Sequence, residues 1–330
     1  LLAIHENNTL IYCLREKTSK LWELIKQTMK EWSEDKASRL AAGLAYYTVF
    51  SIPPLLVVAI GIASLFTERQ VVEQQVTSQA GALMGARGEE AIETILQSAE
   101  EPGQGELLPT LLGIGLLIFG ASGAFTALQD SLDTVWDVQA DPQRGILAAI
   151  KERFFSFTMV LVVGFILLVS LMLSTLLASF GNFVGGLVVE AEIILWLINF
   201  AISFGVIMGL FVLIFKIVPD VEIAWRDVVI GAAITAVLFK IGEYTLSFYF
   251  ERSDPTSAFG AAGSVILLLL WVYYSAQILF LGAEFTQVYT REYGSGMKPE
   301  RGAVLLTEAA KATQGMPSDK MVAKEKAQQG

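Results

Sequence analysis

The chain has 330 residues, of which 54% are hydrophobic and only 17% are charged. A soluble domain is nearer a quarter charged, so this composition predicts an integral membrane protein. One His and one Cys exclude a histidine-based catalytic cluster, a Cys/His zinc site and an intrachain disulfide. The net charge of −10 argues against nucleic-acid binding. We expect no enzyme activity, no cofactor and no metal.

Residues 1–39 precede the first long apolar stretch, and residues 15–35 have the pattern of an amphipathic helix. One interpretation places this helix in the headgroup region of an anionic leaflet, because tryptophans and lysines border its apolar face. The other packs it against the cytoplasmic ends of the membrane spans. The pattern rests on apolar residues at helical spacing with lysines among them: Trp22, Ile25, Met29 and Trp32, with Lys20, Lys26 and Lys30.

Six stretches are apolar enough to cross a bilayer core, which needs about 20 helical residues. The sequence therefore predicts an all-α polytopic membrane protein with a six-helix transmembrane domain over residues 40–293. The fifth stretch is the least lipid-like, because it contains two charged residues. The predicted spans are 40–66, 107–128, 154–180, 193–217, 227–250 and 263–289.

Lys and Arg are distributed unequally between the two sides of these spans. Nineteen of the 23 fall in segments on the side of the two termini, and three fall in the alternate connections. The positive-inside rule then predicts that the N- and C-termini are cytoplasmic. The longest external segment, 67–106, has two apolar stripes at helical spacing, which predict two short helices.

The first span holds consecutive prolines, Pro53 and Pro54, a few residues after Tyr47 and Ser51. Two prolines remove two N–H donors and disfavour helical geometry in the residues before them. One interpretation is a broken helix with Tyr47 and Ser51 beside the break, acting as a binding or gating element. The other is a simple packing kink.

The second span is rich in glycine, which permits close approach of a neighbouring helix within the chain or in another subunit. Its continuation carries Asp130, Asp133 and Asp137 along one side. We expect these carboxylates at the cytoplasmic mouth, where they attract cations or form a solvated helix end. A basic partner such as Arg144, Lys151 or Arg153 is expected nearby, because Asp is unfavourable at a helix C-terminus.

Lys240, Glu243 and Ser247 share one face of the fifth span, near or beyond its midpoint. Charges inside lipid usually face a cavity or another charge. They are therefore either a self-neutralising structural pair or a charged site in a central cavity that meets an anionic or zwitterionic substrate.

Tyr273, Gln277 and Glu284 form a polar stripe on the sixth span. Glu284 is either a buried acid in a pathway or an interface acid that pairs with a base such as Arg226 or Arg291. From residue 294 onward the hydrophobic periodicity fades, so residues 294–330 are expected to be a flexible cytoplasmic tail.

Three segments resemble the YihY/BrkB family of bacterial inner-membrane proteins: AGLAYYTVFSIPP from residue 42, PDVEIAWRDVVIGAAITAVLFKIGEYTLSFYF from residue 219, and GAAGSVILLLLWVYYSAQILFLGAEFTQVY from residue 260. The resemblance implies a six-helix membrane protein. It also implies a loose association with serum resistance in one branch and with passage of lipid A precursors in another. The family's older label, ribonuclease BN, is generally regarded as mistaken.

Three classes of function fit this sequence to different degrees. A transporter moves a lipid or an amphipathic or anionic solute through a central cavity; no nucleotide-binding loop is present, so pumping requires an ion gradient. A non-transporting envelope scaffold is the alternative. A ribonuclease is disfavoured, because the few clustered carboxylates have no basic RNA platform beside them. The expected partners are membrane lipids and a second copy of the chain.

Overall fold

The computed structural model describes residues 19–64, 68–100, 107–141, 190–252, 259, 262–313 and 315–316. The predicted third span, 154–180, lies outside these residues, as do Arg144, Lys151 and Arg153. The described part of the chain is mostly helical, as the sequence predicted.

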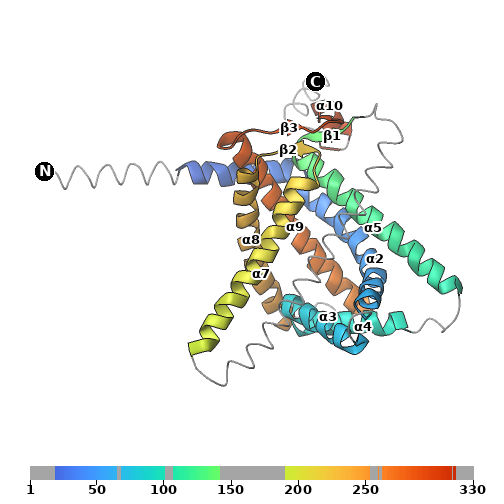
Figure 1. Ribbon diagram of the computed structural model, residues 1–330. Coiled ribbons are helices and arrows are strands. Elements are labelled where there is room, and N and C mark those ends of the chain that lie inside the picture. Colours follow the sequence, from blue (N-terminus) through green and yellow to red (C-terminus); the bar gives the residue numbers. More distant parts are fainter. Residues whose placement is uncertain are drawn as a thin grey trace.

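The long helices run between two ends of the molecule (Figure 1). Residues 19–34 form a separate N-terminal helix, which a turn at residues 35–36 joins to the first long helix. The long helices are α2 (Ala37–Ala63), α5 (Leu107–Val135), α7 (Glu190–Ile217), α8 (Trp225–Arg252) and α9 (Gly263–Glu292).

Four of these helices are long and apolar enough to span a membrane, and they correspond to the predicted spans one, four, five and six. The stretches that qualify within the described residues are Ala37–Gly61, Phe200–Ile217, Trp225–Phe250 and Gly263–Glu292. Helix α5 begins at the predicted second span and continues seven residues beyond it.

One end of the bundle carries short strands, and we call it the strand end (Figure 1). β1 (Val138–Ala140) pairs antiparallel with β4 (Ala303–Leu305), with Gln139 opposite Val304. β2 (Val221–Glu222) pairs antiparallel with β3 (Lys298–Pro299). The short helix α10 (Glu308–Thr313) follows β4, and the N-terminal helix lies across this end (Figure 1).

The structure differs here from the expected flexible tail. Residues 298–313 form β3, β4 and α10, and residues 317–330 lie outside the described part of the chain. The strands are two or three residues long, too short for periodicity to reveal them. Their partners, β1 and β2, lie far away in sequence, so pairing depends on the folded bundle.

Helices α3 (Arg69–Met84) and α4 (Ala86–Glu100) lie at the opposite end and match the two predicted short helices (Figure 1). Their apolar residues meet α2 and α9 in one core cluster that includes Met84, Ile92, Val49 and Val272. Burial of this apolar stripe explains how two polar helices are held against the bundle.

A larger core cluster lies towards the strand end. Trp136, Phe215 and Phe280 are fully buried there, with residues of α2 and α8 around them. Because the ends of α2, α5, α7, α8 and α9 meet at this cluster, it fixes the backbone positions on which the candidate site depends.

The prolines do not interrupt the first span. Helix α2 continues from Ala37 to Ala63 with Pro53 and Pro54 inside it, so the structure does not show the broken helix of the first interpretation. Helix formation within a membrane is strongly favoured, because the bilayer core has no water to bond the backbone groups. A membrane-spanning helix tolerates proline when neighbouring groups donate hydrogen bonds to the carbonyls that proline leaves unpaired.

Candidate functional site

A cluster of buried carboxylates lies where four segments meet at the strand end. The Lys311 ammonium of α10 lies 3.1 Å from Asp35 Oδ1, at the end of the N-terminal helix, and it also pairs with Asp137 Oδ1, just after α5. The Lys311 side chain is only 15% exposed. One cation therefore joins two carboxylates that are about a hundred residues apart in sequence and brings α10 against both.

Glu284 of α9 completes the cluster. Its side chain is 0% exposed, and neither carboxylate oxygen has a hydrogen-bond partner among the residues that the structure describes. The charges of Asp35, Glu31, Asp137 and Lys311 act on it. A buried carboxylate without a donor is costly, because burial removes the water that would solvate its charge.

The cationic and amide donors on the same face of α9 are bound to other acids. The Arg291 guanidinium donates to Glu31 Oε1 at 2.9 Å. The Gln287 amide donates to Asp137 Oδ2 at 3.1 Å, and Gln287 Oε1 is buried with no partner among the described residues. The expectation that Glu284 pairs with Arg226 or Arg291 is therefore not met, and the alternative of a buried acid describes this residue.

The pKa values of Asp35 and Lys311, two cluster residues outside the membrane-spanning helices, are shifted. Burial, opposed by Lys311 and reinforced by Asp137 and Glu31, raises the pKa of Asp35 from 3.8 to about 6. Burial lowers the pKa of Lys311, but the Asp35 and Asp137 carboxylates outweigh that effect and raise it above its ordinary value. Lys311 thus stays charged, whereas Asp35 changes charge near neutral pH.

Two turns with unusual backbone geometry place these side chains. Lys36, directly after Asp35, has φ of 52°, and Asp137 has φ of 55°. They are the non-glycine residues with left-handed φ in the described part of the chain. Such conformations are uncommon and concentrate at functional sites, and here they turn the N-terminal helix and α5 towards the cluster.

The three carboxylates of the predicted acidic stripe have different surroundings. Asp133 is buried and accepts a hydrogen bond from the Asp220 backbone N at 2.8 Å, so it anchors the turn after α7. Asp130 is exposed, and Asp137 belongs to the cluster. The basic partner of Asp137 is Lys311, which sequence spacing gave no reason to select.

Lys240 and Glu243 form an ion pair along α8, with Nζ 2.9 Å from Glu243 Oε2. Their side chains are mostly buried, and Ser247 is half-buried one turn further on. Between the two charges, Gly242 packs against Tyr274 and Ile278 of α9. The two opposite charges therefore contact each other, and the two interpretations differ in whether a cargo also meets them.

Residues near the prolines form a tight contact with α5. The Ser51 hydroxyl donates to the Thr48 carbonyl at 2.9 Å. Gly120 lies against Ser51, and Gly123 lies against the Tyr47 ring so closely that a Cβ there would overlap it. Gly120 and Gly123 thus serve a contact within the chain, and Tyr47 and Ser51 are part of that contact.

Tyr273 and Gln277 precede Glu284 on α9. Tyr273 packs against both large core clusters. Gln277 Oε1 is buried with no hydrogen-bond partner among the described residues. Together with Glu284 they line α9 as predicted, but only Glu284 reaches the carboxylate cluster.

The N-terminal helix has one face packed on the bundle and another that is exposed. Leu24 is buried against Phe285 and Val288 of α9, so one face packs on the bundle. Another face leaves Trp22 69% exposed. The same apolar surface includes Leu21, Ile25 and Met29.

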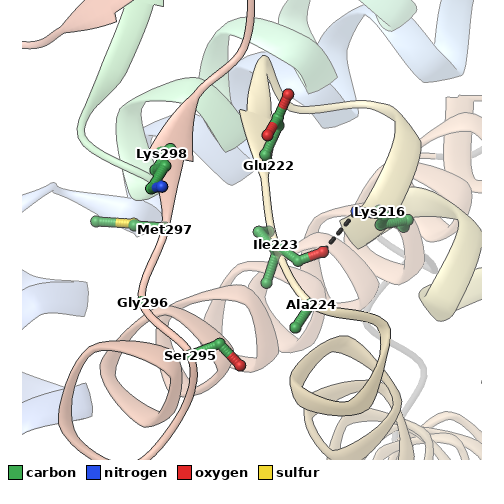
Figure 2. Close-up of a pocket in the computed structure, with 8 residues that line it drawn as sticks. All are labelled: Lys216, Glu222, Ile223, Ala224, Ser295, Gly296, Met297 and Lys298. Carbon is green, nitrogen blue, oxygen red and sulfur yellow. Dashed lines mark hydrogen bonds between the residues drawn. The ribbon is translucent and has the colours of Figure 1, made fainter.

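A separate cavity of about 650 Å³ lies beside β2 and β3 (Figure 2). Lys216 and Lys298 contribute to its lining, and Figure 2 shows them on opposite sides of the β2 segment. The Lys216 ammonium donates to the Ile223 carbonyl at 2.5 Å and lies 5.7 Å from the Trp225 ring centre. The two cations therefore do not form one anion clamp.

Comparison with known proteins identifies the family. The family model described as Virulence factor BrkB matches residues 28–304. The chain belongs to the BrkB family. It is similar to proteins named UPF0761 membrane protein from Alcanivorax borkumensis (26% identical, covering 78% of this chain and 58% of that protein) and Aeromonas salmonicida (28% identical, covering 77% and 86%). No solved structure matches it.

The family match covers the acids of the cluster but not its lysine. Glu31, Asp35, Asp137 and Glu284 lie inside residues 28–304 of this BrkB-family chain, whereas Lys311 lies beyond them. Sequence reasoning missed Asp35, Gln287 and Lys311, because none stands out in its local pattern. The signal that could have found Gln287 was its position three residues after Glu284, which places both polar side chains on one face of α9.

Proposed function

We propose that this protein is a transporter-like inner-membrane protein that moves or binds a lipid or an amphipathic, anionic solute. The observation that carries the proposal is Glu284: a fully buried carboxylate, without a donor among the described residues, within a helix that can span a membrane. Ionisable residues in spans are costly and usually mark a pathway or a relay.

The position of the cluster supports an orientation for this activity. The strand end holds the segments that are rich in Lys and Arg, so we propose that it faces the cytoplasm, as the positive-inside rule predicts. The exposed Trp22 and Ile25 then lie at the level of the inner-leaflet headgroups. This location favours an amphipathic cargo that approaches from the membrane.

A scaffold without transport activity is the second candidate, and one observation favours it. Lys240 and Glu243 neutralise each other along one helix, so the mid-span charges have a structural explanation and require no cargo. The two proposals differ in whether Glu284 is needed for movement of a molecule across the bilayer.

The direct test uses proteoliposomes that contain purified protein and a trace of phosphatidylglycerol with a fluorescent headgroup or acyl label. Dithionite bleaches the label in the outer leaflet, and later bleaching reports lipid that has crossed from the inner leaflet. The rate is measured with and without a pH gradient, because the chain has no nucleotide-binding loop to supply energy.

The decisive variant is Glu284→Gln, with Glu292→Gln as its matched control. Glu292 lies on the same helix but is 44% exposed. We expect wild-type protein and the Glu292 variant to accelerate crossing, and the Glu284 variant to approach the rate of protein-free vesicles. Equal rates in wild-type and protein-free vesicles contradict lipid transport, and an unimpaired Glu284 variant contradicts the role of this residue.

A further inference from the structure

The described cations and amide near Glu284 are already bound to other acids. Lys311 pairs with Asp35 and Asp137, and Arg291 pairs with Glu31 and Glu292. The amide of Gln287 donates to Asp137. Glu284 therefore needs one further positive charge, since a buried anion without a partner is strongly disfavoured.

A second acceptor points into the same place. Gln287 is 1% exposed, and its amide is fixed in the cluster by the bond to Asp137. Its Oε1 atom is left with no partner among the described residues. Glu284 and Gln287 are three residues apart on one face of α9, so both unpaired groups face the same cluster. Both atoms are acceptors, so what is missing is a donor.

A proton is the smallest donor that satisfies this arrangement. On Glu284 it removes the buried charge and turns one acceptor oxygen into a donor for an acceptor such as Gln287 Oε1. Within the described residues, no three His, Cys, Asp or Glu side chains are arranged to hold a metal ion. The geometry thus favours a proton over a coordinated metal.

We propose that Glu284 is a proton-exchange site whose occupancy is controlled by the segment that carries Lys311. The inference deepens the proposed function, because it names the proton as the coupling ion of a gradient-driven transporter. The coupling role rests on the proposed function, whereas the proton site itself does not. The charges that act on Glu284 are Glu31 and Asp35 before α2, Asp137 after α5 and Lys311 on α10. Gln287 and Arg291 share its face of α9, three and seven residues further on.

The controlling segment, residues 303–313 with 315–316, is attached to the strand end by a small set of contacts. It is held by the three-residue pairing of β4 with β1, by the ion pairs of Lys311, and by the Lys36 ammonium on the Gly315 carbonyl. Leu306 and Met316 are its buried apolar anchors. Lys311 is the cation of the cluster, so its loss leaves the acids around Glu284 without that positive charge.

The test is carbodiimide labelling of the full-length protein in detergent, which needs no cargo. Dicyclohexylcarbodiimide reacts with a protonated carboxyl in an apolar site: the acid proton moves to a carbodiimide nitrogen, a carboxylate oxygen adds to its central carbon, and acyl migration gives a stable N-acylurea. Peptide mass spectrometry locates the adduct. Labelling is followed from about pH 6 to about pH 9, in sodium and in choline chloride.

We expect labelling at Glu284 that falls about tenfold per pH unit above its midpoint and is equal in the two salts. Lys311→Met should retain labelling at a pH where the wild type has lost it, whereas Lys298→Met, an exposed control at the same end, should follow the wild type. Protection by sodium at constant pH, or labelling that does not vary with pH, overturns the proposal.

An infrared measurement covers the case in which the reagent does not reach the site. The carbonyl stretch of a protonated carboxylic acid should be present in wild-type protein at neutral pH and absent in Glu284→Gln, which is isosteric with the neutral acid. Equal spectra overturn the proposal. If the labelling and infrared results are as expected but no lipid crosses in vesicles, the lipid cargo is rejected and the proton site is retained.

Discussion

Gly282 of α9 lies directly against Thr235 of α8, and the contact is reciprocal, because Gly231 of α8 lies against Thr286 of α9. Each threonine hydroxyl donates to the carbonyl of the glycine one turn earlier in its own helix, at 2.8 Å for Thr235 and 2.6 Å for Thr286. The hydroxyls are thus satisfied internally, and the hydroxyl and methyl groups of each threonine fill the space that glycine leaves.

Gly282→Ala should therefore weaken the α8–α9 interface. A Cβ at Gly282 would lie inside 3.0 Å of three Thr235 atoms, and overpacking of this kind costs about 1–3 kcal/mol. We expect a lower melting temperature in detergent. Gly205→Ala is the matched control, because a Cβ there meets nothing within 4 Å. Partial recovery in a Gly282→Ala, Thr235→Ala double variant would identify the clash as the cause.

Lys311→Met should loosen the attachment of residues 303–313 to the strand end without detaching them, because the β1–β4 pairing remains. The substitution leaves the buried Asp35 without its ion pair, and breaking a buried pair costs about 3–5 kcal/mol, less here because Asp137 is partly exposed. Faster hydrogen exchange in β4 and α10, with α9 unchanged, is the expected result. Equal exchange in wild-type protein and the variant would show that the ion pairs do not hold this segment.

The stability of the protein should rise as the pH falls from about 7 to about 5. Asp35 has a pKa of about 6 in the folded protein against 3.8 in its ordinary state. The folded protein therefore binds this proton more tightly, and the stabilisation is complete below pH 3.8 and is lost as the pH rises through about 6. A shift of this size corresponds to about 3 kcal/mol at most.

Asp35→Asn removes the titrating group, so it should reduce this pH dependence. The measurement is the thermal or denaturant midpoint of both proteins across the same pH series. Glu292→Asn provides a control at an exposed carboxylate. If the Asp35 variant and the wild type have the same slope, the carboxyl responsible for any pH dependence lies elsewhere.

Lys240 and Glu243 should behave as one unit in a double-mutant cycle. Lys240→Met and Glu243→Gln alone each leave a mostly buried charge without its partner, at a cost of about 3–5 kcal/mol. The double variant should be less destabilised than the sum of the two, because neither charge remains. Melting temperatures of the four proteins give the coupling.

The same four proteins separate structure from function at this pair. If the double variant retains full lipid crossing in vesicles, the pair neutralises itself and has no transport role. Loss of crossing at unchanged melting temperature would instead restore the charged-site interpretation. Ser247→Ala, one turn further along α8, is a mild control for changes on this face.

The sequence by itself determined what depends on neighbours within one segment. Apolar stretches located four of the described helices within a few residues, and the two stripes in residues 67–106 predicted α3 and α4. The Lys240–Glu243 pair also followed from spacing, because residues three apart on a helix are in contact whatever surrounds them. Local periodicity carries this information directly.

Only the tertiary structure decided which distant groups meet Glu284. Its surroundings come from Asp35, Asp137 and Lys311, on three segments separated by about a hundred residues or more. It also converted Asp133 from an expected surface acid into a buried acceptor for the Asp220 backbone N, and it carried α2 through two prolines. Helical spacing specifies the face on which a side chain lies, but the partner on that face is set by how the helices pack, because many weak contacts over the whole bundle determine it.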